Sequence, residues 1–122
     1  MPSLASTDGT SLYYEESGTG TPVLFVHEFA GNHRTWAAQM AALGKTHRCI
    51  AYSARGYPPS DVPDSDDAYG QDIAVSDAIA VLDALDIKRA HIVGHSMGAY
   101  TALHVGLNLS LIHISEPTRR RG

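Results

Sequence analysis

The segment Gly94-His95-Ser96-Met97-Gly98 is the strongest indication of how this chain folds. An apolar run precedes it at residues 90–93, and a small-residue helical pattern follows it at 99–103. The order is therefore strand, sharp turn and helix, with a serine at the turn. Glycines two residues before and after the serine let the strand and helix approach closely, because glycine has no Cβ. This pattern is typical of a nucleophile elbow, which presents a hydroxyl at a helix N-terminus.

Two more apolar, β-rich runs precede distinctive loops. Residues 23–26 lead into His27-Glu28-Phe29-Ala30-Gly31, followed by a helical pattern over 33–43 for which Asn32 is a suitable N-cap. Residues 49–52 lead into a segment that contains Arg55-Gly56 and Ser60-Asp61. A simpler reading of the serine stretch, a glycine-rich turn before a buried helix, is disfavoured by the β-branched run before it.

With these three segments in this order, the chain resembles the α/β-hydrolase fold family, in particular its single-domain esterase, lactonase and peroxidase-like members. Residues 27–31 are similar to the loop after the family's third strand, 55–61 to the segment after its fourth, and 94–98 to its nucleophile elbow. The resemblance covers residues 4–108. It implies an α/β fold with a mostly parallel twisted sheet, flanking helices and an N-terminal antiparallel hairpin, truncated relative to the family.

The local patterns agree with that architecture. We expect a hairpin from 4–7 and 12–17 around the Asp8-Gly9 turn, and buried parallel strands at 23–27, 48–52 and 90–94. Apolar residues at helical spacing predict a helix over 71–86. On that helix we expect the acidic side chains to point outward; they are Asp77, Asp83 and Asp86. Cys49, the only cysteine, is expected to be a small core residue.

The resemblance assigns roles to individual residues. It implies that Ser96 is the nucleophile, and that the backbone N–H groups of Met97 and Phe29 stabilise the oxyanion. His27 is expected to anchor its loop by hydrogen bonds. The other residues implied in the site are Gly94, His95 and Gly98 in the elbow, His27, Glu28 and Gly31 in the oxyanion loop, and Trp36 and Tyr100 as pocket or packing residues.

Glu28 departs from the family pattern, which has glycine at that position. A carboxylate aimed at the oxyanion site would oppose the negative charge that develops there. Glu28 must therefore point away, or its backbone differs, or the site has another role.

The expected function is that of a serine hydrolase acting on carboxylic esters, lactones or related acyl compounds. Serine rather than aspartate at position 96 argues against the dehalogenase and epoxide-hydrolase branches of the family. The alternative is a non-catalytic ligand-binding protein on the same fold. The family's acid and histidine follow the serine in the chain, and His104 reads as a helix packing residue. We therefore expect both catalytic partners beyond residue 122, and no activity from these 122 residues alone.

Residues 109–119 read like the translation of a transposase-based sequencing adapter. We accordingly interpret 1–108 as the N-terminal portion of a hydrolase domain and 109–122 as a non-native tail. A natural C-terminal helix or strand is the alternative, because the run is apolar enough to pack.

Charge and hydropathy indicate which classes of binding partner to expect. Without the tail the net charge is −6 rather than −4, with six basic and twelve acidic residues, which argues against a nucleic-acid partner. No apolar run reaches the roughly 20 residues of a membrane helix, and the N-terminus has no secretory pattern. We expect a cytoplasmic protein with a small-molecule acyl substrate and neither metal nor cofactor. The sequence does not indicate an oligomeric state.

Overall fold

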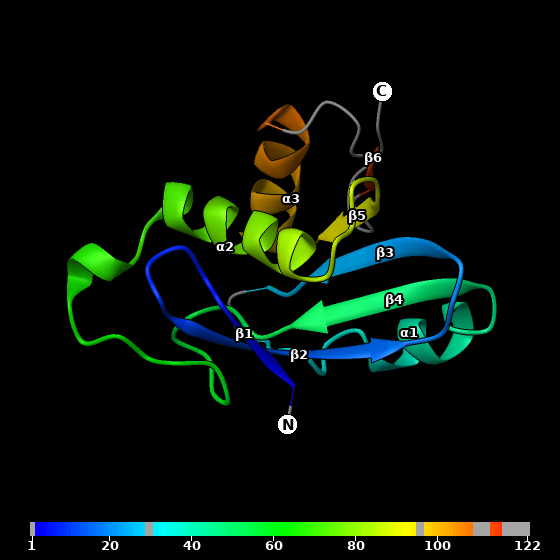
Figure 1. Cartoon of the computed structure of the whole chain (residues 1–122), viewed down its shortest axis with the longest axis horizontal. Helices are drawn as coiled ribbons and strands as arrows, with labels where there is room; N and C mark the ends of the chain where they lie inside the picture. Colours follow the sequence, from blue (N-terminus) through cyan, green and yellow to red (C-terminus); the bar gives the residue numbers. More distant parts are fainter. Residues whose placement is uncertain (1, 29–30, 95–96, 109–112, 116–122) are drawn as a thin grey trace.

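The computed structural model describes residues 2–28, 31–94, 97–108 and 113–115. Within them, a mixed sheet has the strand order β1-β2-β4-β3-β5-β6. Helices α2 and α3 cover one face of the sheet and α1 covers the other (Figure 1). The elements are β1 (Ser3–Ala5), β2 (Ser11–Ser17), β3 (Thr21–Val26), α1 (Ala37–Leu43), β4 (His47–Tyr52), the 3-10 turn η1 (Asp66–Ala68), α2 (Gln71–Ala84), β5 (His91–Gly94), α3 (Met97–Asn108) and β6 (His113–Ser115).

The predicted N-terminal hairpin is present. β1 and β2 pair antiparallel with Leu4 opposite Leu12. Gly9 occupies the turn with φ +88°, a conformation that glycine adopts without a steric penalty. β2 also pairs antiparallel with β4, so the hairpin joins the sheet at the outer edge of its parallel part.

The predicted parallel strands form the centre of the sheet. Leu24 in β3 lies opposite Ile50 in β4 and Ile92 in β5, and all three are fully buried against α2 and α3. Phe25 points to the opposite face, where it packs with α1 and with Cys49, which is fully buried as predicted. Because β3, β4 and β5 are parallel, their carboxyl ends meet at one edge of the sheet.

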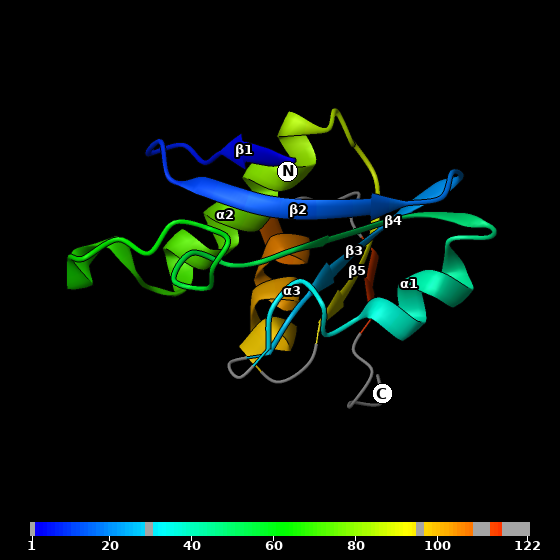
Figure 2. The ribbon, with the colours of Figure 1, turned by 90° about the horizontal axis from the view of Figure 1, so that it is seen from below.

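The first helix is shorter than predicted. It begins at Ala37 rather than at residue 33, because residues 33–36 form a turn. The Asn32 side chain accepts the Arg34 N–H at 2.8 Å, so it caps this turn and not the helix itself. Figure 2 shows α1 toward the end of the sheet where β4 begins, and α3 toward the end where β4 finishes.

The prediction that Asp77 points outward is wrong. Asp77 is 2% exposed and accepts two hydrogen bonds from Arg55, at 2.7 Å from Nε and 2.8 Å from Nη2. Ser6 donates to the same carboxylate. The remaining Arg55 N–H groups donate to Asp8 and to the Ala68 carbonyl, so all five guanidinium donors are used. A charge can be buried on α2 because these partners surround it. Asp83 and Asp86 are exposed, as predicted.

The last described strand is β6, which pairs parallel with β5. A three-residue pairing does not test the proposed adapter origin of residues 109–122, which stays a prediction. No helix in the described part of the chain is both long and apolar enough to cross a membrane.

The buried ion pair predicts a stability effect. Asp77→Asn removes the charge that faces Arg55, and breaking a buried pair costs about 3 kcal/mol or more of unfolding free energy. Urea unfolding at neutral pH measures this loss. The control is Asp83→Asn on the exposed side of the same helix, with an expected change within about 0.5 kcal/mol. Equal effects of the two substitutions would contradict the role given to Asp77.

The ion pair of Asp8 with Arg55 predicts how the free energy of unfolding changes at low pH. Hydrogen bonds from Arg55 and Thr10 hold the pKa of Asp8 well below its ordinary value of 3.8. The unfolded chain therefore takes up this proton more readily, so the stabilisation is complete above about pH 4 and is lost as the pH falls. Asp8→Asn should lower the urea concentration at the unfolding midpoint at pH 7. Below pH 4 this midpoint should fall less steeply with pH in Asp8→Asn than in the unsubstituted chain. An unchanged decline would show that other groups control acid unfolding.

Candidate active site

Two glycines bring the end of β5 against the start of α3. Gly94 ends β5 and α3 begins at Met97, so only two residues connect strand and helix. A Cβ on Gly94 would lie 2.3 Å from the Gly98 carbonyl oxygen, and a Cβ on Gly98 would lie 2.2 Å from that of Val26. The close approach predicted from the sequence is therefore present, and it places the first turn of α3 against the carboxyl end of β3.

The predicted nucleophile lies outside the described residues. Ser96 and His95 form the connection between β5 and α3, and Phe29 falls in a second such gap. The backbone of Met97 stands at the N-terminus of α3, where the first N–H groups of a helix have no partner within the helix. Those groups suit an oxyanion. The roles given to Ser96, Met97 and Phe29 stay predictions.

His27 anchors the loop after β3, as expected. Its Nε2 accepts the Ala54 N–H at 2.9 Å, so Nδ1 carries the proton and donates to the Glu28 carbonyl at 2.8 Å. Burial lowers the pKa of His27 below the usual value for histidine, which favours this neutral form. Both ring nitrogens are engaged, so His27 serves as an anchor and not as a base.

The Glu28 side chain is held by its own loop. Its Oε1 accepts the Thr35 hydroxyl at 2.9 Å, and its carbonyl accepts the Gly31 N–H at 3.0 Å. A Cβ on Gly31 would lie 1.9 Å from Glu28 Oε1 and 2.1 Å from Thr35 Oγ1, so glycine leaves room for this contact. Of the possibilities raised by the sequence, the structure favours a carboxylate directed toward Thr35.

A cavity of about 600 Å³ opens beside the carboxyl ends of β3 and β4. Val26 and His27 from β3 and its loop, Tyr52 from β4, and Thr101 from α3 contribute to its wall. Exposed Val62 and Tyr69 also line it, from the segment between β4 and α2. Thr101 lies four residues after Met97, so the cavity reaches to within about one helical turn of the N-terminus of α3. Its size is within the ordinary range of small-molecule sites.

The charged groups in the described wall compensate each other. Arg55 and Asp77 both line the cavity, yet the five Arg55 donors are used within the protein. Both Asp77 oxygens accept hydrogen bonds from Arg55. Tyr52 contributes a phenol whose pKa is raised by burial and by the nearby Asp77 charge, so it stays protonated at neutral pH. The wall therefore offers apolar and neutral polar surface.

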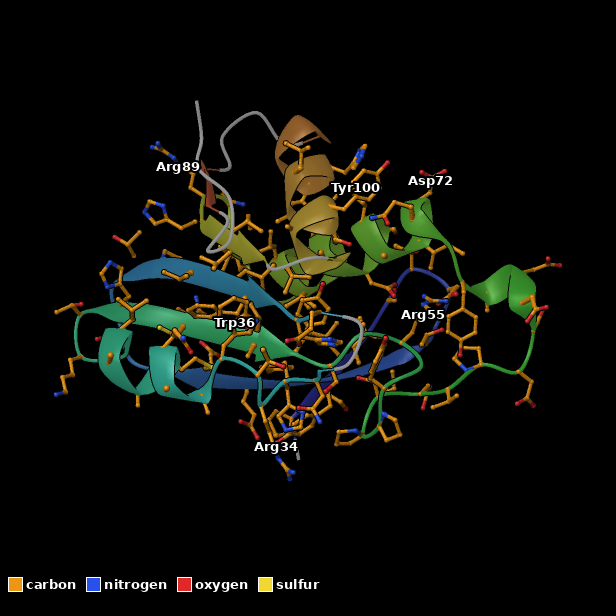
Figure 3. All side chains as sticks on the ribbon, turned by 180° about the vertical axis from the view of Figure 1, so that it is seen from behind. Arg34, Trp36, Arg55, Asp72, Arg89 and Tyr100 are labelled. Atoms are coloured by element: carbon orange, nitrogen blue, oxygen red, sulfur yellow. The ribbon has the colours of Figure 1, made fainter. Side chains whose placement is uncertain are left out.

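The two predicted pocket residues lie on opposite sides of the sheet (Figure 3). Trp36 is 5% exposed and packs on Phe25, with ring centroids 5.3 Å apart, between α1 and the sheet. Tyr100 is 52% exposed on α3 and packs on His104 at 4.4 Å. Neither is among the described residues that line the cavity. Each side chain contacts a neighbouring ring in the described structure, and a role in substrate binding stays a prediction.

Sequence reasoning missed several residues of the site. Tyr52, Asp77 and Thr101 line the cavity, but each falls within a regular strand or helix pattern that indicates only packing. The motif that contains Arg55 could have pointed to Asp77, because a buried guanidinium requires an acidic partner. In the described part of the chain, no three His, Cys, Asp or Glu side chains are grouped to hold a metal ion.

Comparison with known proteins agrees with this geometry. The family model described as alpha/beta hydrolase fold matches residues 21–110, which include both loops and the elbow. The chain belongs to the α/β-hydrolase fold family. The described fold therefore represents part of an α/β-hydrolase core, with the candidate site at the carboxyl ends of its parallel strands.

Similar α/β-hydrolases have several activities in their names. The chain is 40% identical over 103 residues to an epoxide hydrolase of Caballeronia sordidicola, covering 84% of this chain and 31% of that protein. It is 36% identical over 85 residues to a 3-oxoadipate enol-lactonase of Acinetobacter baylyi, covering 70% and 31%. A putative non-heme bromoperoxidase of Mycobacterium tuberculosis is 35% identical over 94 residues, covering 75% and 35%.

Solved structures show the same arrangement. An epoxide hydrolase from an endophytic Streptomyces superposes with a TM-score of 0.87 at 31% identity, covering 94% of this chain and 35% of that one. The chain thus spans about a third of the length of the relatives it matches.

The glycine contact at the elbow makes a direct prediction. Gly98→Ala places a methyl group against the Val26 carbonyl, so the backbone must shift, at a cost of about 1–3 kcal/mol of unfolding free energy. Urea unfolding measures the loss. Tyr100→Ala, an exposed position on the same helix, is the control and should change stability much less. Gly98→Ala with full stability would show that α3 does not pack on β3 as described.

Proposed function

We propose that the complete protein is a serine hydrolase that acts on neutral carboxylic esters, lactones or related acyl compounds, with Ser96 as the nucleophile. The observation that carries the proposal is the contact between Gly94 and Gly98, which leaves two residues for a strand-to-helix turn. Such a turn presents a hydroxyl at a helix N-terminus. Membership of the α/β-hydrolase fold family supports the same chemistry.

The proposed reaction has two stages. The Ser96 oxygen attacks the acyl carbonyl, a histidine takes its proton, and the leaving alcohol receives that proton as the acyl-enzyme forms. Water, deprotonated by the same histidine, then attacks the acyl-enzyme and releases the acid and the serine. The backbone N–H groups of Met97 and Phe29 stabilise the oxyanion in both stages. The reaction also requires a catalytic acid and a histidine, which in this family follow the serine in the chain.

The cavity supports a neutral substrate. An anionic substrate needs an unpaired cation to offset its desolvation, but Arg55 already faces Asp77 and Asp8. Apolar and aromatic side chains such as Val62 and Tyr69 supply most of the remaining contact surface. We infer that the acyl or alcohol portion is apolar, and that carboxylate-bearing substrates are turned over poorly.

Epoxide opening is disfavoured by the chemistry of serine, although several relatives are named epoxide hydrolases. A carboxylate that opens an epoxide forms an ester, which water can cleave. A serine oxygen would form an ether, which water does not cleave under enzymatic conditions. Ser96 therefore suits acyl transfer, in which the intermediate is an ester.

The alternative of a non-catalytic binding protein loses its main support. That alternative depended on a Glu28 carboxylate facing the oxyanion site. The bond from Thr35 to Glu28 Oε1 directs the carboxylate into its own loop, and Glu28 is not among the described residues lining the cavity.

Activity-based labelling tests the proposal. The longest reading frame recovered from the source DNA should react covalently with a fluorophosphonate probe, and Ser96→Ala should abolish the reaction. The same protein should hydrolyse p-nitrophenyl butyrate and a medium-chain lactone, but not styrene oxide. A matched ester with a terminal carboxylate should have kcat/KM at least about tenfold lower, the scale of one lost polar contact.

The outcomes separate the candidates. Turnover of styrene oxide without ester hydrolysis would overturn the acyl-transfer proposal. Binding of substrate with neither labelling nor turnover would favour the ligand-binding alternative.

A further inference from the structure

Two histidines fasten the oxyanion loop to one dipeptide. His27, where the loop begins, accepts the Ala54 N–H at Nε2. His33, where the loop ends, donates its backbone N–H to the Ser53 hydroxyl oxygen at 3.0 Å, and its ring Nδ1 lies 2.7 Å from the same oxygen. Ser53 and Ala54 directly follow β4. The two ends of the loop after β3, at His27 and His33, are therefore both attached to one short segment.

Ser53 is itself a fixed point. It is fully buried, its N–H donates to the Tyr13 carbonyl at 2.9 Å, and its carbonyl accepts the Ser60 hydroxyl. Its backbone is thus tied to β2 and to the turn after β4. A hydroxyl on this backbone has little freedom to move, so it can hold the loop in one position.

The other side of the His33 ring is also held. Its Nε2 lies 3.5 Å from Glu15 Oε2, which also accepts the Tyr13 hydroxyl at 2.7 Å. The Tyr13 ring packs edge-on against the imidazole with centroids 4.7 Å apart. His33 is 5% exposed, so this imidazole bridges Ser53 and β2 inside the protein.

We propose that Ser53 and His33 are positioning residues: they hold the far end of the loop after β3, which is the loop proposed above to supply an oxyanion-hole N–H. The proposal rests on the hydrolase function proposed above. Neither residue is among those lining the cavity, so neither contacts the substrate there. Their contribution is to keep a backbone N–H in place, and a displacement of about 1 Å in such a group can cost roughly a hundredfold in rate.

Amide hydrogen exchange of the 122-residue chain tests the attachment itself. Ser53→Ala removes both contacts to His33, and the amides of residues 31–33 should exchange about tenfold faster relative to those of α2, the effect of losing one hydrogen bond. His33→Phe keeps the ring packing on Tyr13 without the ring nitrogens and should give a smaller increase. His33→Asn places a polar atom near the Nδ1 position, so these amides should exchange more slowly in His33→Asn than in His33→Phe.

The matched control is His47→Asn. His47 lies at the opposite end of β4, where its ring contacts the Thr46 hydroxyl, so loop exchange should not change. Loop exchange in Ser53→Ala within twofold of the unsubstituted chain would overturn the proposal.

Kinetics of the longer reading frame tests the positioning role. Ser53→Ala should lower kcat at least about tenfold and leave KM within about twofold, because the oxyanion contact acts mainly in the transition state. His33→Asn should lower kcat less than His33→Phe does, because it keeps a polar atom near the Ser53 hydroxyl. An equal change in KM, or a loss of kcat that only follows a loss of folded protein, would reject positioning. Absence of turnover in the unsubstituted protein would reject the hydrolase function alone, since the exchange measurement still decides the attachment.

Discussion

The structure depends on a close approach that only glycine permits. Gly94 meets the first turn of α3, and Gly98 meets the last carbonyls of β3, so strand, helix and neighbouring strand converge at one point. A side chain at either position would separate them. Because β3, β4 and β5 run parallel, their carboxyl ends lie at this edge of the sheet. The cavity and the His27 anchor lie at the same edge for that reason.

Local patterns predicted the elements whose causes are local. The Asp8-Gly9 turn, the three apolar parallel strands and the α2 stripe follow from residue spacing, and the structure contains them. The start of α1 was misplaced, because Asn32 bonds a turn that precedes the helix. Asp77 was misplaced for a different reason. Its burial depends on Arg55, 22 residues away in the chain, and the pattern of one helix carries no information about such a partner.

In the candidate site, too, the sequence predicted residues in short motifs but not contacts between distant segments. His27 and Gly31 could be assigned from the sequence because they belong to a short motif. Their contacts lie within a few residues or directly after the neighbouring strand β4. The Glu28 orientation could not be derived, since it depends on the Thr35 hydroxyl. The bridge from Ser53 through His33 to Glu15 joins three separate segments and has no short motif.

The Arg55 network bears on how this family can diversify. Its charges are satisfied by the β1–β2 turn, η1 and α2, whereas the cavity surface is set largely by neighbouring apolar positions such as Val62 and Ala74. Substitutions at those apolar positions can reshape the cavity without leaving a buried charge unpaired. The shape of the cavity can therefore change by single substitutions while the ion pairs that join three separate segments stay intact.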